Sequence, residues 1–174
     1  MRARFYTSVT SLALMLISDA VVAQLPAQQP GKGKAPQPDK AYTSASDIAA
    51  MMAKAKNERK QDQAIFSQNI LRLAPYSASL EYRGAVGPAS VHEKEAELFY
   101  VIDGSATLVT GGKLVGETRT NPDNLSGTAI EGGTPQAVAK GDFFIVPENT
   151  PHWFSPINGT LVLMSLHVPR TAAH

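Results

Sequence analysis

Hydrophobic and polar positions follow two different patterns along this chain. Ser44-Ala-Ser-Asp47 matches a helix-capping box, and the Ala- and Met-rich run to about Lys56 has good helix propensity. From Ile65 onward, short apolar or alternating runs are separated by Gly, Pro and Asn, which is typical of β-strands. These runs predict strands at residues 70–73, 79–82, 97–102, 106–109, 137–139, 143–146 and 161–168.

Short strands at fairly regular spacing predict an all-β, antiparallel sandwich or barrel behind one short N-terminal helix. Gly111-Gly112 and Asn158-Gly159 are expected to be hairpin turns. Residues 113–133 form a long polar excursion, and loops of this length are usually functional covers or mobile insertions. Residues 113–133 are therefore a candidate lid.

The N-terminus has the order of a secretory signal. Arg2 and Arg4 precede an apolar run at residues 12–17, and small residues lead to Ala23. Cleavage after Ala23 predicts a periplasmic or secreted protein without an integral membrane span. An uncleaved anchor is the alternative, which the shortness of the run and the presence of Asp19 disfavour.

Composition then divides the chain. Residues 1–23 are the expected signal peptide, and residues 24–43 are a Pro-, Gln- and Gly-rich segment that predicts a flexible linker. Residues 44–63 are the expected N-terminal helical segment, whose polar end is either an exposed extension or a loop. Residues 64–170 are the expected β-barrel domain, and 174 residues suit one domain with appendages.

Charge and cysteine content exclude several classes of function. Loss of residues 1–23 leaves 14 basic and 14 acidic residues, so nothing in the net charge predicts a nucleic-acid partner or an anionic lipid surface. The chain has no cysteine, which excludes disulfides, Cys nucleophiles, thiolate zinc sites and iron–sulfur clusters. Any metal must be bound by His, Asp and Glu.

Three residues form the candidate metal site. His92 and Glu97 flank one expected turn, and His152 follows the tight segment Pro147–Pro151. In a barrel, both segments can direct their side chains into one interior. Two imidazoles and one carboxylate on one face suit Fe(II) and related divalent ions with open coordination positions.

The spacing around His92 resembles the first motif of the cupin superfamily, G-x5-H-x-H-x(3,4)-E-x6-G. It can be laid on Gly84, Ser90, His92, Glu97 and Gly104 with every spacing kept. The one departure is Ser90, where the motif has its first histidine.

The second cupin motif, G-x5-P-x-G-x2-H-x3-N, falls on Gly141, Pro147, Asn149, His152 and Pro156. Asn149 replaces a glycine, and Asn tolerates the left-handed backbone conformation better than most residues. Pro156 replaces an asparagine after the histidine. The resemblance covers about residues 68–169.

This resemblance to a small single-domain, cupin-2-like protein implies a jelly-roll barrel, the double-stranded β-helix, with a metal site in its mouth. By position, His92, Glu97 and His152 would bind one divalent ion, namely Fe, Mn, Zn, Ni or Co. Ser90 would occupy the fourth ligand position, where a serine is a weak ligand. The alternative is a degenerate cupin that keeps the barrel and has lost the metal. Cupins commonly pair through sheet edges, so a homodimer is also expected.

Other polar residues near the motif have simpler interpretations. Glu93, Lys94 and Glu95 are expected to be solvated turn residues. Lys94, if buried beside the site, is a candidate general base, and His167 on the last strand is a candidate acid/base or substrate contact. A lone histidine on such a strand is more often structural.

The favoured function is an exported, metal-dependent enzyme that acts on a small organic molecule. An open two-His-one-Glu site suits dioxygenase chemistry with Fe(II), or Lewis-acid isomerase, lyase or hydrolytic chemistry with other metals. The alternatives are a binding module that captures a small ligand without turnover and a storage or assembly scaffold.

Overall fold

The computed structural model describes residues 37–170, so the predicted signal peptide and most of the predicted linker lie outside the described residues. Helix α1 (Ala45–Glu58) begins at the predicted capping box. Ser44 Oγ accepts from the backbone N–H of Asp47 at 3.1 Å, and Asp47 Oδ2 accepts from the N–H of Ser44 at 3.3 Å. The polar residues after Glu58 form a turn and not a helical extension.

Eleven strands follow within the described part of the chain. They are β1 (Ile65–Leu73), β2 (Tyr76–Arg83), β3 (Ala89–His92), β4 (Glu95–Thr110), β5 (Lys113–Val115), β6 (Thr118–Asn121), β7 (Asn124–Gly127), β8 (Ala129–Glu131), β9 (Thr134–Ala139), β10 (Phe143–Val146) and β11 (His152–Pro169).

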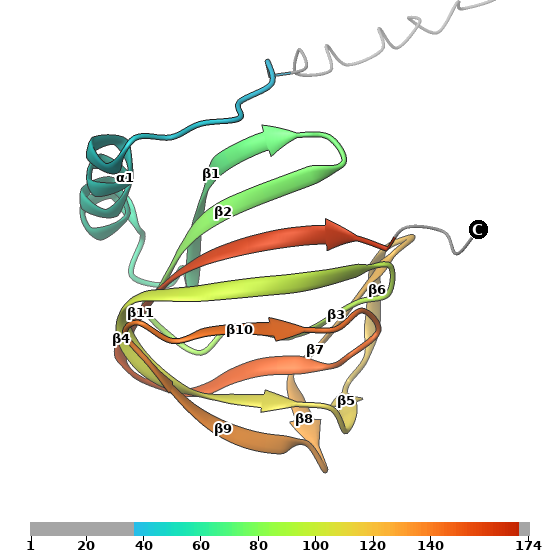
Figure 1. The fold of residues 1–174 in the computed structure, drawn as a ribbon. Helices are drawn as coiled ribbons and strands as arrows, with labels where there is room; N and C mark the ends of the chain where they lie inside the picture. Colours follow the sequence, from blue (N-terminus) through green and yellow to red (C-terminus); the bar gives the residue numbers. More distant parts are fainter. Residues whose placement is uncertain (1–36, 171–174) are drawn as a thin grey trace, which may run out of the picture. The chain divides into compact units, whose positions relative to one another are not determined.

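The sheet is built around the two long strands. β4 and β11 pair with each other in antiparallel register, from Thr110 opposite His152 to Glu95 opposite Pro169. β11 also pairs with β2 and β3, whereas β4 pairs with β9 and β10, so the curled sheet surrounds an interior (Figure 1). All the strand pairings are antiparallel, and the predicted all-β jelly-roll barrel with one short helix is confirmed.

The prediction of a hairpin turn at Asn158-Gly159 is wrong. Both residues lie inside β11, where its pairing with β4 shifts register on either side of Ile157. Opposite this irregularity, Gly104 has φ +85°, and a Cβ atom there would come within 1.8 Å of the carbonyl oxygen of Thr160. Gly104 therefore allows the close approach of the two strands at this irregularity, and the chain does not reverse at Asn158-Gly159.

The segment 113–133 is not the long loop that its polarity predicted. It contains β5, β6, β7 and β8, and β7 pairs with β3 next to His92. Polar side chains do not prevent strand formation where the strand meets solvent, and in β6 all the residues are exposed. The segment thus forms part of the wall beside the candidate site.

Two apolar clusters lie on opposite faces of the sheet. The cluster inside the barrel is centred on residues such as Phe99, Val101 and Phe154. The other cluster lies on the outer face, where Met51 and Met52 of α1 contact residues of β1, β2 and β11. Helix α1, the only helix of residues 37–170, thus packs beside β1 and β2 (Figure 1). It has neither the length nor the apolar character of a membrane-spanning helix.

Candidate metal centre

His92 and Glu97 enter the barrel from two consecutive strands. His92 is the last residue of β3, and Glu97 lies in β4 with its side chain directed inward. Side chains alternate between the two faces of β4: Glu97, Phe99 and Val101 are buried, whereas Tyr100 is 40% exposed on the opposite face. A period of two therefore fixes Glu97 on the inner face.

His152 reaches the same place from the start of β11. The preceding segment turns at Asn149, which has φ +56°, as the asparagine-for-glycine substitution predicted. The backbone N–H of Asn149 donates to the carbonyl oxygen of His92, with an N···O distance of 2.7 Å. This hydrogen bond joins the two motif segments directly at the site.

The structure brings the three predicted ligands together around one carboxylate. Oε2 of Glu97 lies 3.2 Å from Nε2 of His92 and 3.1 Å from Nε2 of His152. Ligand atoms of all three residues lie within 4.8 Å of one another. Glu97 and His152 are each 4% exposed, so this group lies at the bottom of the site.

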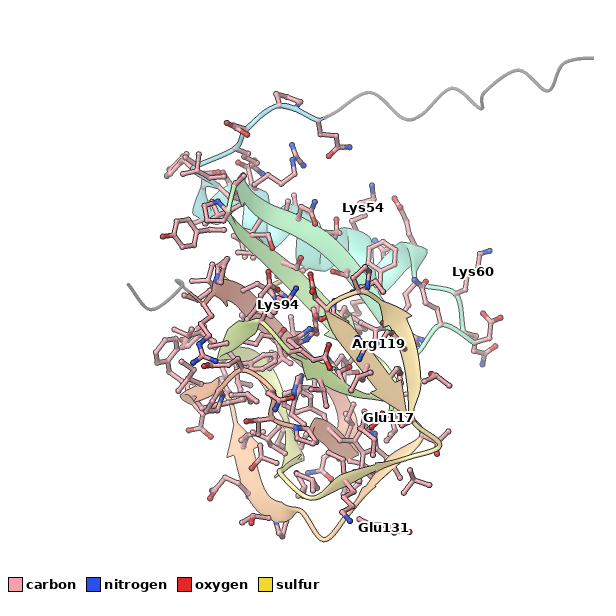
Figure 2. The ribbon with its side chains drawn as sticks, turned by 90° about the vertical axis from the view of Figure 1, so that its right-hand side faces the viewer. Lys54, Lys60, Lys94, Glu117, Arg119 and Glu131 are labelled. Carbon is pink, nitrogen blue, oxygen red and sulfur yellow. The ribbon has the colours of Figure 1, made fainter. Side chains whose placement is uncertain are left out.

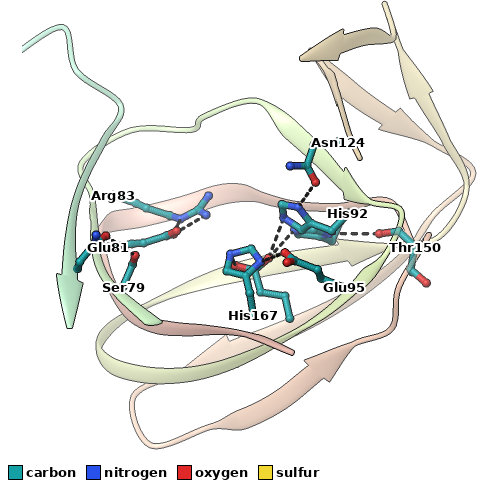
Figure 3. A network of polar contacts seen from close by, with 11 residues as sticks. Ser79, Glu81, Arg83, His92, Glu95, Asn124, Thr150 and His167 are labelled. Atoms are coloured by element: carbon teal, nitrogen blue, oxygen red, sulfur yellow. Dashed lines mark hydrogen bonds and ion pairs between the residues drawn. The ribbon is translucent and has the colours of Figure 1, made fainter. Parts of the chain in front are cut away.

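The outer ring nitrogens of the histidines have oxygen partners. Nδ1 of His92 lies 2.7 Å from Oδ1 of Asn124, and Nδ1 of His152 lies 3.2 Å from the carbonyl oxygen of Thr150 (Figure 3). Both oxygens only accept hydrogen bonds, so each Nδ1 must donate. In the neutral imidazoles, both Nε2 lone pairs then face a carboxylate with no proton between them.

A cation bound among these atoms would remove that repulsion. Donor atoms bound at about 2.1 Å to one ion, at angles of roughly 90–110°, lie about 3.0–3.4 Å apart. The 3.1 Å and 3.2 Å separations from Glu97 fall in this range. The oriented Nδ1 groups also match the outer contacts that usually hold metal-binding histidines. The residues present therefore fit a divalent ion.

The electrostatics of the group favour an ionised carboxylate. Burial alone raises the pKa of Glu97, but contacts with His152 and His92 outweigh it and hold that pKa far below its ordinary value. Burial lowers the pKa of His92, but Glu97 and Asn124 outweigh this effect and raise it. Glu97 is thus a carboxylate at any physiological pH.

Lys94 does not meet the condition for a general base. Its side chain is 70% exposed and its Nζ pairs with Asp123, whereas Arg119 pairs with Glu93. Both cations, labelled in Figure 2, are therefore surface residues. The prediction that Glu93 and Lys94 are solvated agrees with these contacts.

The prediction that Glu95 is a turn residue is wrong, although its side chain is partly exposed. Glu95 begins β4, and its Oε2 lies 3.0 Å from Nδ1 of His167. Because β4 begins at Glu95 and not at Glu97, the period of two places both carboxylates on one face. The sequence contained this signal in the spacing of the two glutamates.

Asn124 and His167 complete the surroundings. Asn124 was not predicted as a site residue, because its contact with His92 depends on the pairing of β7 with β3. His167 lies opposite Glu97, with its Nε2 3.4 Å from Oε1 of Glu97. Ser90, in the fourth ligand position of the family motif, pairs with His152 across the strands.

A second polar group lies inside the barrel. Arg83 is 8% exposed, and its Nε and Nη2 donate to Oε2 of Glu81 at 2.9 Å and 2.6 Å (Figure 3). Its guanidinium also lies 4.7 Å from the ring centroid of Phe154. Ser165, 1% exposed, has a hydroxyl without a hydrogen-bond partner. The interior of the barrel is thus polar beyond the histidines.

Comparisons with known proteins agree with the motif spacing. A family model described as Cupin matches residues 57–172, which is 116 of the 174 residues. No curated protein matches the sequence.

Solved structures with similar folds are distant in sequence. KdgF from Halomonas sp. is 18% identical, with a TM-score of 0.46 over 66% of this chain and 86% of that chain. The Schizosaccharomyces pombe Cnp3 cupin domain is 13% identical, with a TM-score of 0.47 over 63% and 67%. Fe(II) HppE is 15% identical, with a TM-score of 0.47 over 61% of this chain and 52% of that chain.

Proposed function

The chain belongs to the cupin family, and we propose that it is a metal-dependent enzyme that acts on a small organic molecule. The observation that carries this proposal is the convergence of the His92 and His152 Nε2 atoms on Oε2 of Glu97, at 3.2 Å and 3.1 Å. Two imidazoles and a carboxylate bind one divalent ion, with Fe, Mn, Zn, Ni and Co all suited to this donor set.

When bound, such an ion supplies either Lewis-acid activation of an oxygen-bearing substrate or, as Fe(II), oxygenase chemistry. The protein's own residues do the positioning. Asn124 and the Thr150 carbonyl hold the two imidazoles by their Nδ1 atoms, and Glu97 supplies a negative charge at the bottom of the barrel. The exposed fraction of the side chain is smallest for His152, larger for His92 and largest for Glu95. A substrate would therefore approach from the Glu95 side.

One observation favours a second function. Ser90 replaces an imidazole of the family motif, which supports a non-catalytic, small-ligand-binding cupin whose metal site has degenerated. In that case the barrel interior around Arg83 and Glu81 would recognise the ligand.

Export and pairing complete the proposal. We infer from Arg2, Arg4, the apolar run and Ala23 that the chain is exported to the periplasm or secreted. We also propose a homodimer. Phe143 and Ile145 of β10 are 67% and 57% exposed, and Phe143 lines an apolar hollow of about 240 Å³.

An oxygen-consumption screen with small phenolics and Fe(II) tests the oxygenase form of this proposal. The wild type should consume oxygen with at least one substrate, and Glu97→Gln should lose this activity, whereas Glu93→Gln, on the surface pair with Arg119, should keep it. The same three proteins assayed for isomerase or lyase turnover test the Lewis-acid form.

The binding-module alternative gives a different result. A small ligand would raise the melting temperature equally with and without a chelator, and no metal would change it. That outcome, together with the absence of turnover in both assays, would contradict the enzyme proposal.

A further inference from the structure

His167 has the position of an additional ligand. It lies directly opposite Glu97 in the β4–β11 register, so both side chains are on the inner face of the barrel. We propose that His167 is a third imidazole ligand of the metal and takes the role of the histidine that Ser90 replaces. This inference rests on the proposed metal site and extends it to His92, His152, His167 and Glu97.

The distances place His167 beside Glu97 and His92, and ligand atoms of His92, Glu95 and His167 lie within 4.8 Å of one another. Its Nε2 lies 3.4 Å from Oε1 of Glu97, inside the range of about 3.0–3.4 Å expected for two ligands of one ion. Its ring centroid lies 4.8 Å from that of His92, and the His92 and His152 centroids are 5.3 Å apart. Three imidazoles therefore surround a single carboxylate.

Packing of this kind is unfavourable without a cation. Glu97 can neutralise one protonated imidazole, and each further protonated ring would repel the first at these distances. In neutral His92 and His152, whose Nδ1 atoms donate to Asn124 and to the Thr150 carbonyl, both Nε2 lone pairs would face an acceptor. One divalent ion would accept these two lone pairs and that of His167 and would also neutralise the carboxylate.

Glu95 gives His167 the outer contact that Asn124 and Thr150 give the other histidines. Its Oε2 lies 3.0 Å from Nδ1 of His167, but off the direction of the N–H bond, so Nδ1 has no hydrogen bond. The Glu95 side chain is 35% exposed and can turn to align with it. A carboxylate behind a histidine strengthens it as a metal ligand.

The alternative is that His167 is an acid/base residue that does not touch the metal. A ligand is favoured because Nε2, the atom that would have to reach a substrate proton, is the atom directed at Glu97. A ligand role for His167 also explains how the site tolerates serine at position 90, because the missing imidazole is then supplied by His167 of β11.

Titration of the metal-free protein with Co²⁺, in competition with a chelator, tests the proposal without an activity assay. His167→Ala and His167→Gln should weaken Co²⁺ binding by at least about 100-fold, and Glu95→Gln by about 10–100-fold. The visible absorption of the remaining bound Co²⁺ should change in both His167 variants because the coordination sphere changes. Glu93→Gln, in the surface pair with Arg119, is the matched control and should bind as the wild type does.

Folding is checked by circular dichroism of the metal-free variants, and Glu95→Gln keeps the imidazole in place if either His167 variant fails to fold. Wild-type affinity and an unchanged Co²⁺ spectrum in the His167 variants would overturn this proposal and leave the three-residue site intact. A wild type that binds no metal, in contrast, would overturn the proposed function itself.

Discussion

The backbone N–H of Asn149 donates to the carbonyl oxygen of His92, and Asn149 makes this bond from a left-handed conformation with φ +56°. The turn before β11 is thereby fixed to the end of β3. The position of one candidate ligand thus depends on the backbone beside another.

This contact predicts how position 149 responds to substitution. A β-branched residue in the left-handed region costs about 1–2 kcal/mol, whereas glycine adopts it freely. Asn149→Val should lower the free energy of unfolding of the metal-free protein by that amount, and Asn149→Gly should leave it nearly unchanged. Urea denaturation measures both, and equal stability of the two variants would contradict the assignment.

Asn124 should affect metal binding without being a ligand. Its Oδ1 accepts from Nδ1 of His92, and loss of such an outer contact typically weakens metal affinity about 10–100-fold. Asn124→Leu should show this loss in a Co²⁺ titration, whereas Asn124→Asp keeps an acceptor and should retain most of the affinity. Asn158→Leu, which alters an exposed asparagine, is the control. Equal affinity of Asn124→Leu and the wild type would show that the contact is irrelevant.

The stability of the metal-free protein should have a maximum between about pH 5 and 6.5. Contacts with the histidines overcome burial and lower the pKa of Glu97, so its contribution is present above its unfolded pKa and disappears as pH falls. Glu97 raises the pKa of His92 against the effect of burial, so that contribution is present below about 6.5 and disappears as pH rises.

Urea midpoints measured across this pH range in a chelator test both limbs. Glu97→Gln should flatten the acid limb, and His92→Gln should flatten the alkaline limb. Added metal should reverse the alkaline loss, because the neutral imidazole is the form that binds. Stability that keeps rising above pH 7 without metal would contradict the His92 assignment.

The buried Arg83–Glu81 pair should be sensitive to the loss of one partner. The two side chains are 10% and 14% exposed, and removal of one charge from such a pair typically costs about 3–5 kcal/mol. Arg83→Met should therefore destabilise the protein by that amount in urea, while Arg83→Met with Glu81→Leu should recover most of it. A double variant that is no more stable than the single one would rule out an uncompensated Glu81 charge as the cause.

Much of the fold could be predicted from the sequence because its strands alternate with a period of two. Glu97, Phe99 and Val101 share the inner face as that period requires, and the capping box at Ser44 starts the helix. Asn149 could be assigned a left-handed conformation because few residues other than glycine adopt one.

The rest depends on strand register, which a single sequence does not contain. His167 faces Glu97, and Asn124 faces His92, only because β11 and β7 pair in one particular alignment. For the same reason Asn158-Gly159 was predicted as a hairpin, although it lies at a bulge inside β11. Residues 113–133 were predicted as a loop because strands with exposed, polar faces lack the apolar alternation that identifies a strand.

The central claim is that His92, Glu97 and His152 bind one metal ion, and elemental analysis tests it most directly. The protein should be purified without a polyhistidine tag, and metal should be measured per chain for the wild type and for His152→Ala. We predict close to one divalent ion per wild-type chain and a large loss in the variant. Equal, near-zero metal content in both proteins after exposure to Fe, Mn, Zn, Ni and Co would contradict the claim.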